Sequence, residues 1–169
     1  MNDKSTKYYS TIQENMVAKY LGWKVVSGSG ARDLSPGDVI SDKYIGECKT
    51  HMNIVNDIIF RADVWDKICA EGLSRFKHPV LIVDDGTQKD VNTWIMTSWQ
   101  AIDISKCAVY ECPLTLFKIS VNIKFDNSSM KTLRNRLYLS ESRPIAFTFK
   151  FRGDDVVTMC LEDFREAVN

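Results

Sequence analysis

Two short segments carry acidic and basic residues in a spacing suited to metal-dependent hydrolysis. Asp38 precedes Val39–Ile40, and Glu47 and Lys49 lie in Tyr44–Lys49. If these segments are neighbouring strands, alternation of side chains places Glu47 and Lys49 on one face. Carboxylates are hard oxygen ligands for Mg²⁺, which keeps several waters when it binds a protein. One such water can attack a phosphodiester while a lysine orients it or offsets developing charge. The pattern predicts a nuclease.

Each of these residues also has a simpler interpretation. Asp38 follows Pro36-Gly37, and aspartate is common in turns. Glu47 and Lys49 are also compatible with a cross-strand ion pair on an exposed face. The three residues together, behind a glycine-rich loop and ahead of a long apolar helical pattern, favour a site.

Two more residues are candidates for the same site. Glu14 lies on a predicted helix, from which its carboxylate can project toward the cation. The alternative is a capping box formed with Thr11, three residues earlier. His51 follows Lys49 by two residues and is either a DNA contact or general base, or a polar residue at a strand end.

The segment Ser27-Gly28-Ser29-Gly30 is neither a dinucleotide fingerprint nor a P-loop, because G-x-G-x-x-G is incomplete and Gly-Lys-Ser/Thr is absent. It is a turn, or a loop whose backbone N–H groups and hydroxyls of Ser27 and Ser29 approach a DNA phosphate. Arg32 is a second candidate phosphate contact, or a solvated side chain.

Length and composition predict one globular domain over residues 1–169, which are 44% hydrophobic and 26% charged. No apolar run approaches the roughly 20 residues of a membrane span. The first residues are polar and lack the apolar core of a secretory signal. We therefore expect a cytoplasmic protein, in the host cytosol if it is phage-encoded, without a membrane partner.

Of the five cysteines, three are predicted to be reduced core thiols. Cys48, Cys69 and Cys160 lie in apolar patterns typical of a core. Cys107 and Cys112 are spaced more widely than C-x-x-C and have no histidine near them, so zinc is not expected.

The net charge is zero, but charge is segregated along the chain. Between Lys124 and Arg152, seven bases face two acids, a local charge of +5, and the residues after Arg152 carry −4. A basic run is either a solvated face or a DNA-binding surface. For the second case, Lys131, Arg134 and Arg136 are the candidate phosphate contacts.

Apolar periodicity and turn residues predict an α/β arrangement. Helices are expected over Lys7–Leu21, Asn56–Phe76, from Ser128 or Ser129 to Tyr138, and Glu162–Val168, with a short helical segment at Ser98–Ile102. Strands are expected at Trp23–Val26, Val39–Ile40, Tyr44–Lys49, Pro79–Val83, Val91–Thr97, Ile145–Phe151 and Val156–Leu161, with Leu114–Phe125 as one strand or a pair. Pro79–Val83 is continuously apolar and is expected to be a central strand, buried on both faces.

Glu14, the loop Gly28–Gly30, Pro36-Gly37-Asp38-Val39 and Glu47-Cys48-Lys49 resemble the PD-(D/E)xK nuclease superfamily. Their order is similar to that of Holliday-junction resolvases of the archaeal type and their phage-encoded relatives. The resemblance implies a restriction-endonuclease-like core over about residues 6–86, with a mixed central β-sheet flanked by helices. Residues 87–169 form a C-terminal α+β extension, longer than the ending of a minimal resolvase.

The resemblance also implies roles for single residues. Glu14, Asp38 and Glu47 would hold Mg²⁺, with Mn²⁺ able to substitute, and Lys49 would position the water or stabilise the transition state. Ser27 or Ser29 would match the loop serine of the family. The enzymes of this family are homodimers that cut opposed strands of a four-way DNA junction. Pro-Gly-Asp in place of Pro-Asp is a small departure from their pattern.

The sequence thus predicts a Mg²⁺-dependent DNA endonuclease, in the first place a Holliday-junction resolvase. One alternative is a restriction- or repair-type nuclease acting on ordinary duplex. Another is a catalytically idle DNA-binding or interaction module on a nuclease fold.

Overall fold

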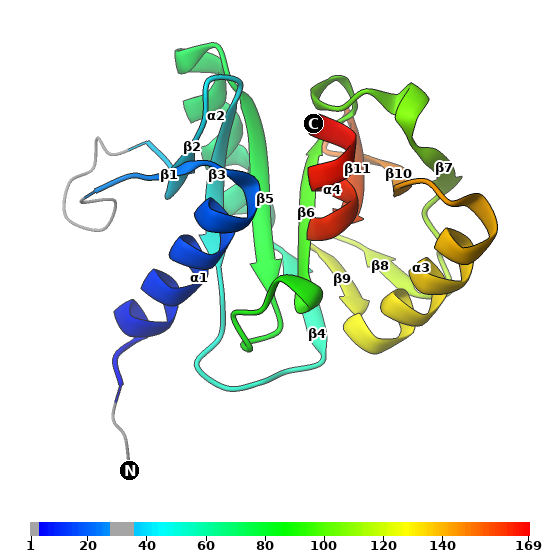
Figure 1. Ribbon diagram of the computed structural model, residues 1–169, viewed down its shortest axis with the longest axis horizontal. Helices are drawn as coiled ribbons and strands as arrows, with labels where there is room; N and C mark the ends of the chain where they lie inside the picture. The colour runs from blue at the N-terminus through cyan, green and yellow to red at the C-terminus, as the bar shows by residue number, and fades with distance from the viewer. Residues whose placement is uncertain (1–3, 28–35) are drawn as a thin grey trace.

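An eight-stranded mixed sheet runs through the computed structural model, which describes residues 4–27 and 36–169 (Figure 1). Its strand order is β1 (Lys24–Val25), β2 (Val39–Ile40), β3 (Tyr44–Lys49), β5 (His78–Asp84), β6 (Thr93–Ser98), β11 (Asp154–Cys160), β10 (Ile145–Phe151) and β7 (Ala108–Glu111). The pairs β3–β5 and β10–β7 are parallel and the other pairs are antiparallel. The protein is therefore α/β with a mixed central sheet flanked by helices.

Helices and a second, smaller sheet cover the two faces of this sheet. The helices are α1 (Thr6–Leu21), α2 (Ala62–Arg75), α3 (Asn127–Glu141) and α4 (Leu161–Val168), and short 3₁₀ turns lie at Asp90–Asn92, Trp99–Ala101 and Ile104–Lys106. The smaller sheet has the order β4 (Asp57–Phe60), β9 (Ile123–Asp126) and β8 (Phe117–Ile119). Among the described residues, no helix combines the length and apolar character needed to cross a membrane.

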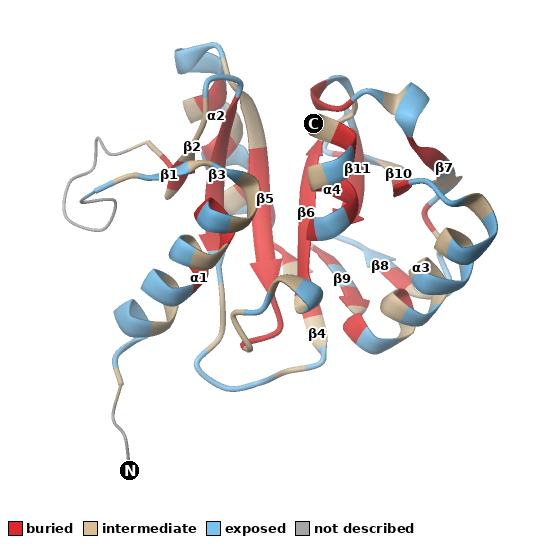
Figure 2. Ribbon diagram, viewed as in Figure 1, coloured by how far each residue is buried: buried red, intermediate tan, exposed pale blue. Residues whose placement is uncertain are grey.

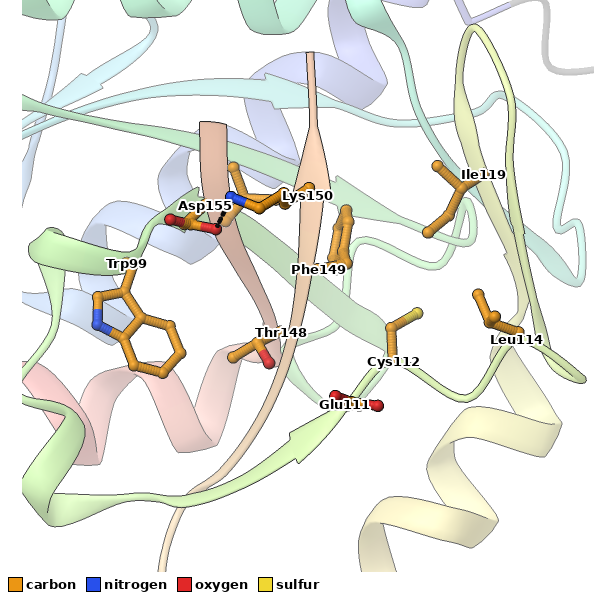
Figure 3. A pocket seen from close by; sticks show the side chains of 10 residues that line it. Trp99, Glu111, Cys112, Leu114, Ile119, Thr148, Phe149, Lys150 and Asp155 are labelled. Atoms are coloured by element: carbon orange, nitrogen blue, oxygen red, sulfur yellow. Dashed lines mark hydrogen bonds and ion pairs between the residues drawn. The ribbon is translucent and has the colours of Figure 1, made fainter. Parts of the chain in front are cut away.

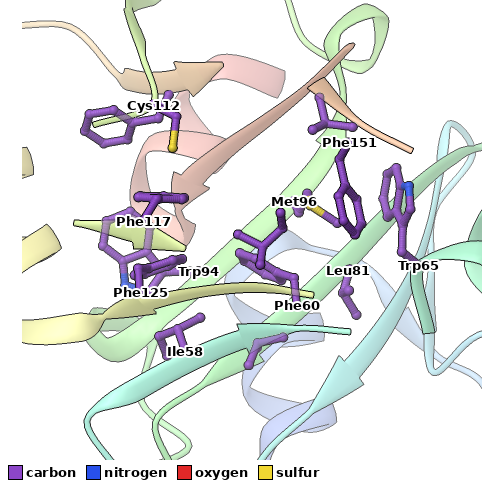
Figure 4. Close-up of a cluster of buried hydrophobic side chains, with 14 of the residues drawn as sticks. Ile58, Phe60, Trp65, Leu81, Trp94, Met96, Cys112, Phe117, Phe125 and Phe151 are labelled. Atoms are coloured by element: carbon purple, nitrogen blue, oxygen red, sulfur yellow. The ribbon is translucent and has the colours of Figure 1, made fainter. Parts of the chain in front are cut away.

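Two apolar clusters lie on opposite faces of the large sheet. On one face, Val17 of α1 and Phe164 of α4 pack with Cys48 and Ile82. On the other, Trp65 of α2 packs with Leu81, and the small sheet and α3 contribute to the same cluster (Figure 4). The central strands are accordingly buried along most of their length (Figure 2). Side-chain alternation along β3 thus directs successive residues toward α1 or toward α2.

The strongest sequence patterns gave the correct elements. The helix at the N-terminus, the paired strands β2 and β3, and the buried strand β5 are confirmed. Gly22 ends α1 in the left-handed conformation, with φ of 71°, as expected of a stop glycine. Leu114–Phe125 is a strand pair rather than one strand, because β8 and β9 pair antiparallel. All five cysteines are free thiols, which confirms the prediction made for Cys48, Cys69 and Cys160.

The predicted helix Asn56–Phe76 is wrong over its first residues. Asp57–Phe60 is the strand β4, which pairs antiparallel with β9, and the helix begins only at Ala62. Ile58 and Phe60 are fully buried by this pairing, which a helical periodicity does not anticipate. Leu73 of the helix has the apolar character of a core residue but is 80% exposed.

Two further differences concern the second half of the chain. Strand β7 was not predicted, and α3 is capped by Asp126, whose side chain accepts a hydrogen bond from the Ser129 N–H, rather than by Ser128 or Ser129. Strands β6, β7, β10 and β11 continue the sheet that β3 and β5 begin. Residues beyond Gly86 therefore share one sheet with the predicted core.

Candidate functional site

The pairing of β2 with β3 places Asp38 beside the segment that carries Glu47. Val39 lies opposite Gly46, and the Asp38 N–H donates to the Gly46 carbonyl at 2.8 Å. The Asp38 carboxylate in turn accepts a hydrogen bond of 2.8 Å from the Cys48 N–H through Oδ2. Asp38 is thus held against β3 by its backbone and by its side chain, as a turn residue alone would not be.

Glu47 and Lys49 share one face of β3 and are bonded to each other. Lys49 Nζ lies 2.7 Å from Glu47 Oε1, while Cys48 points to the opposite face and is 5% exposed. The pair lies on one strand, and the Glu47 side chain is only 6% exposed. The ion pair of the simpler interpretation is therefore present, but it lies within one strand and its carboxylate is buried, so the cross-strand, exposed arrangement is wrong.

The ion pair keeps Lys49 charged. Burial by itself would lower the pKa of the Lys49 ammonium, but the hydrogen bond and the negative charge of Glu47 outweigh it, so the pKa is raised. At neutral pH, Lys49 is therefore an ammonium held against a carboxylate.

Glu14 of α1 belongs to the same group of charges. Burial, followed by the negative charges of Asp38 and Glu47, raises its pKa to about 7, and Lys49 acts in the opposite direction. Helix α1 is fixed there by Gln13, a fully buried side chain whose Nε2 donates to the Lys49 carbonyl at 2.8 Å.

The alternative role of Glu14 in a capping box is wrong. The N-cap of α1 is Ser5, and its side chain makes no capping hydrogen bond. Thr11 lies within the helix, where its hydroxyl donates to the Lys7 carbonyl at 2.8 Å. Glu14 is therefore free of a capping role and lies, partly buried, near the other carboxylates.

The donor set suits a hard divalent cation. Asp38, Glu47 and Glu14 supply carboxylate oxygens, and the mutual repulsion that raises the Glu14 pKa would be relieved by a positive ion. In the described part of the chain, no group of three or more histidine, cysteine or acidic side chains is placed so that it could hold a metal ion. Mg²⁺ does not need one, because it commonly binds one or two carboxylates and retains waters.

Helix α2 adds two residues that the sequence analysis did not single out. Glu71 Oε2 accepts a hydrogen bond of 2.8 Å from the Gly37 N–H. Lys67 Nζ lies 3.9 Å from Glu47 Oε1 and 3.9 Å from Glu71 Oε1. Their i,i+4 spacing on the helix that follows the acidic strands was the available signal. Two lysines, Lys49 and Lys67, thus flank Glu47.

An apolar cavity of about 190 Å³ adjoins the charged group, and Lys49 is one of its lining residues. His51 lines it as well and is half-buried. The larger cavity in Figure 3, about 600 Å³ between Trp99 and Phe149, is lined by none of the site carboxylates. The larger of these two cavities therefore does not mark the acidic site.

The predicted phosphate contacts in the loop are only partly described. Ser27 is exposed. Ser29 and Arg32 lie outside the described residues, which stop at 27 and resume at 36.

The basic segment 124–152 is less available to DNA than its composition suggested. Arg134 donates to both oxygens of Asp163 on α4, and its side chain is 11% exposed. Asp163 itself is fully buried, and its hydrogen bond raises the pKa of Arg134 further. Arg134 therefore joins α3 to α4, and this pairing argues against its predicted role as a phosphate contact.

Other bases of the segment differ in their pairing. Lys131 donates to Asn92 Oδ1 at 2.7 Å, and Arg136 is exposed. Several more are paired with acids on other elements: Lys124 lies 3.0 Å from Asp57, Lys150 lies 2.8 Å from Asp155, and Arg152 lies 2.7 Å from Asp66. Much of the local positive charge is thus neutralised by the fold.

Comparison of the chain with protein-family models, with curated proteins and with solved structures gives no match.

Proposed function

We propose that the protein is a Mg²⁺-dependent endonuclease that hydrolyses DNA phosphodiester bonds. The observation that carries the proposal is the grouping of Glu14, Asp38 and Glu47 around the ammonium of Lys49. These side chains come from α1, the start of β2 and β3, and each carboxylate is close enough to shift the pKa of its neighbours. Clustered carboxylates disfavour their own ionisation, and such arrangements concentrate at functional sites.

The residues have distinct roles in this proposal. Glu14, Asp38 and Glu47 would hold Mg²⁺, and Mn²⁺ would substitute for it. When bound, the cation polarises the phosphate and supplies a water of lowered pKa. Lys49 stays protonated because Glu47 raises its pKa, so it acts on the developing negative charge rather than as a general base. Lys67 supplies a second ammonium close to Glu47.

The fold family, the substrate class and the assembly belong to the same proposal. A mixed sheet carrying Asp and Glu-x-Lys on adjacent strands supports a restriction-endonuclease-like core. The resemblance to archaeal-type and phage resolvases supports a homodimer that acts on four-way DNA junctions. The rivals are a restriction- or repair-type duplex nuclease and an idle DNA-binding module.

A cleavage assay with matched aspartate variants tests the proposal. The protein is offered a four-way junction, a linear duplex and a single strand, each in Mg²⁺, Mn²⁺ or EDTA. We expect metal-dependent cleavage, loss of at least about a hundredfold in Asp38→Asn, and wild-type rates in Asp42→Asn. Asp42 is an exposed residue of the turn between β2 and β3, so it controls for a change of charge in the same hairpin.

Each rival predicts a different result in the same assay. No cleavage in either metal, or undiminished cleavage by Asp38→Asn, would show that the acidic group is not a catalytic centre. Equal rates on junction and linear duplex would remove the junction preference and leave the hydrolysis.

A further inference from the structure

The cavity beside Lys49 has an apolar interior and a polar rim. Its inner walls come from three elements: Ile59 of β4, Val64 of α2, and Leu81 and Val83 of β5. Leu81 is fully buried and Val83 is 3% exposed, so the floor of the cavity is the core of the protein. The rim is formed by Lys49, Thr50, His51 and Arg61.

This cavity lies on the same face of the sheet as the candidate catalytic group. In the parallel pair β3–β5, Glu47 is opposite Leu81 and Lys49 is opposite Val83. Leu81 and Val83 belong to the apolar cluster on the α2 side, and side-chain alternation places Glu47 and Lys49 on that side too. Lys49 therefore contacts Glu47 and borders the cavity with the same side chain.

The size and walls of the cavity fit one flat ring. Pockets for drug-sized ligands have volumes of about 300–1,000 Å³, so a cavity of about 190 Å³ suits a fragment such as a single base. Enzymes that take a base out of the stack hold it between aromatic or apolar side chains. Aliphatic walls of Ile59, Val64 and Leu81 provide such a slot.

The rim suits the phosphates on either side of that base. Lys49 and Arg61 are cationic, and His51, which lines the cavity with them, is half-buried. Arg61 is paired with Asp63 at 2.7 Å, but both side chains are more than 60% exposed. Such a surface pair contributes little, so Arg61 can exchange Asp63 for a phosphate at small cost.

We propose that this cavity receives an unpaired nucleobase next to the phosphodiester that is cut. The inference rests on the proposed nuclease function and specifies its substrate class, which is DNA with an unpaired or unstacked nucleotide at the cut. In an intact duplex, extruding a base costs a few kcal/mol, and the cost is least where the base is already unpaired. A bulge or a strained branch point is therefore bound in preference to a perfect duplex.

The test measures binding without cleavage, in Ca²⁺ in place of Mg²⁺. Two duplexes are compared, one fully paired and one with a single unpaired 2-aminopurine. We expect the wild type to bind the second about tenfold more tightly. We also expect the emission of its 2-aminopurine to rise on binding, because the ring leaves the base stack and the aliphatic walls do not stack on it.

A cavity-filling variant with a matched control makes the test specific. Val64→Phe should abolish the preference for the unpaired duplex and leave binding of the paired duplex unchanged. Val121→Phe makes the same substitution at a site that is 74% exposed, and should change neither the preference for the unpaired duplex nor the binding of the paired duplex. A thermal unfolding scan shows that each variant is folded.

Several outcomes would overturn the inference. One is a wild type with no preference and no change in emission, a result that does not depend on any variant folding. Another is a folded Val64→Phe protein that keeps the preference. Cleavage in Mg²⁺ is measured separately. Selective binding without cleavage in any metal would refute the proposed hydrolysis but support the nucleobase as the ligand of the cavity. Cleavage without selective binding would support the hydrolysis and refute the nucleobase.

Discussion

The carboxylate of Glu71 holds the backbone N–H of Gly37 at 2.8 Å, and so fixes the residue that precedes Asp38. Gly37 has a φ of 57°, and a Cβ atom there would lie 2.8 Å from the Gly46 carbonyl oxygen. Close approach of this turn to β3 is what allows Asp38 to bond the Cys48 N–H. Helix α2 thus positions an acidic residue that it does not itself carry.

Replacing Glu71 tests this positioning. Glu71→Ala leaves the Gly37 N–H without its acceptor, and we expect a loss of about 1–3 kcal/mol in unfolding free energy. If Asp38 acts in cleavage, the rate should fall at least about tenfold. Glu71→Gln keeps an oxygen acceptor and should retain most of both. Urea unfolding and the cleavage assay measure the two effects.

The exposed Glu111 provides the control for Glu71. Glu111→Ala removes the same charge from β7 and should alter neither stability nor rate. Equal behaviour of Glu71→Ala and Glu71→Gln would mean that the negative charge, and not the hydrogen bond to Gly37, is what matters.

Alanine substitutions at two glycines distinguish the cost of a positive φ from the cost of a close contact. Gly37→Ala forces an alanine into positive φ and also places its Cβ against the Gly46 carbonyl oxygen. Gly153 has a φ of 84° with no heavy atom within 4 Å of the added Cβ, so Gly153→Ala bears the conformational cost alone. We expect Gly153→Ala to lose about 1 kcal/mol in unfolding free energy, and Gly37→Ala clearly more. Equal losses would show that the turn can move away from β3.

The sequence predicted those elements whose patterns have one interpretation. Tyr44–Lys49 and the apolar run of β5 lie inside the large sheet with apolar clusters on both faces, and alternation placed Cys48 opposite Glu47 correctly. The helical prediction fails at Asp57–Phe60 because the apolar residues of this segment also fit a helical period. The strand forms because β9, far along the chain, offers a partner with matching register. Local propensity cannot supply that information.

The candidate site shows the same limit. Asp38, Glu47 and Lys49 could be predicted from the sequence because the pairing of neighbouring strands brings residues at this spacing close together. Lys67 and Glu71 reach the site only through the packing of α2, and Arg134 is removed from the surface by an acid that follows it by 29 residues. Charge summed along a segment says nothing about which acids the fold brings to it.

Arg134 and Arg136 should respond differently to replacement by alanine. Arg134→Ala leaves the fully buried Asp163 without its partner, and we expect a loss of about 3–5 kcal/mol in unfolding free energy. Arg136 is exposed, so Arg136→Ala should stay within about 0.5 kcal/mol of wild type. If α3 faces DNA, Arg136→Ala should also weaken DNA binding. The slope of log affinity against log salt concentration should then fall by about 1. An unchanged slope would make Arg136 a solvated side chain.

The raised pKa of Glu14 predicts that the stability of the metal-free protein depends on pH. Burial, with the charges of Asp38 and Glu47, raises its pKa from 4.5 to about 7. Between these two values the folded protein holds a proton that the unfolded chain releases, so stability falls as the pH rises through this window. Below this pH window the stabilising contribution of Glu14 is fully present, and above the window that contribution is lost. Glu14→Gln cannot ionise and should escape this loss.

We therefore expect Glu14→Gln to gain about 1 kcal/mol over wild type between pH 5 and pH 8, a value reduced for the partial solvent exposure of Glu14. Urea unfolding in EDTA at both pH values measures the difference, and Glu111→Gln, exposed and remote from the carboxylates, should show none. A cation bound among Glu14, Asp38 and Glu47 favours their charged forms. Added Mg²⁺ should therefore stabilise wild type at pH 8 more than it stabilises Glu14→Gln. Equal effects of Mg²⁺ on both proteins would place the cation away from Glu14.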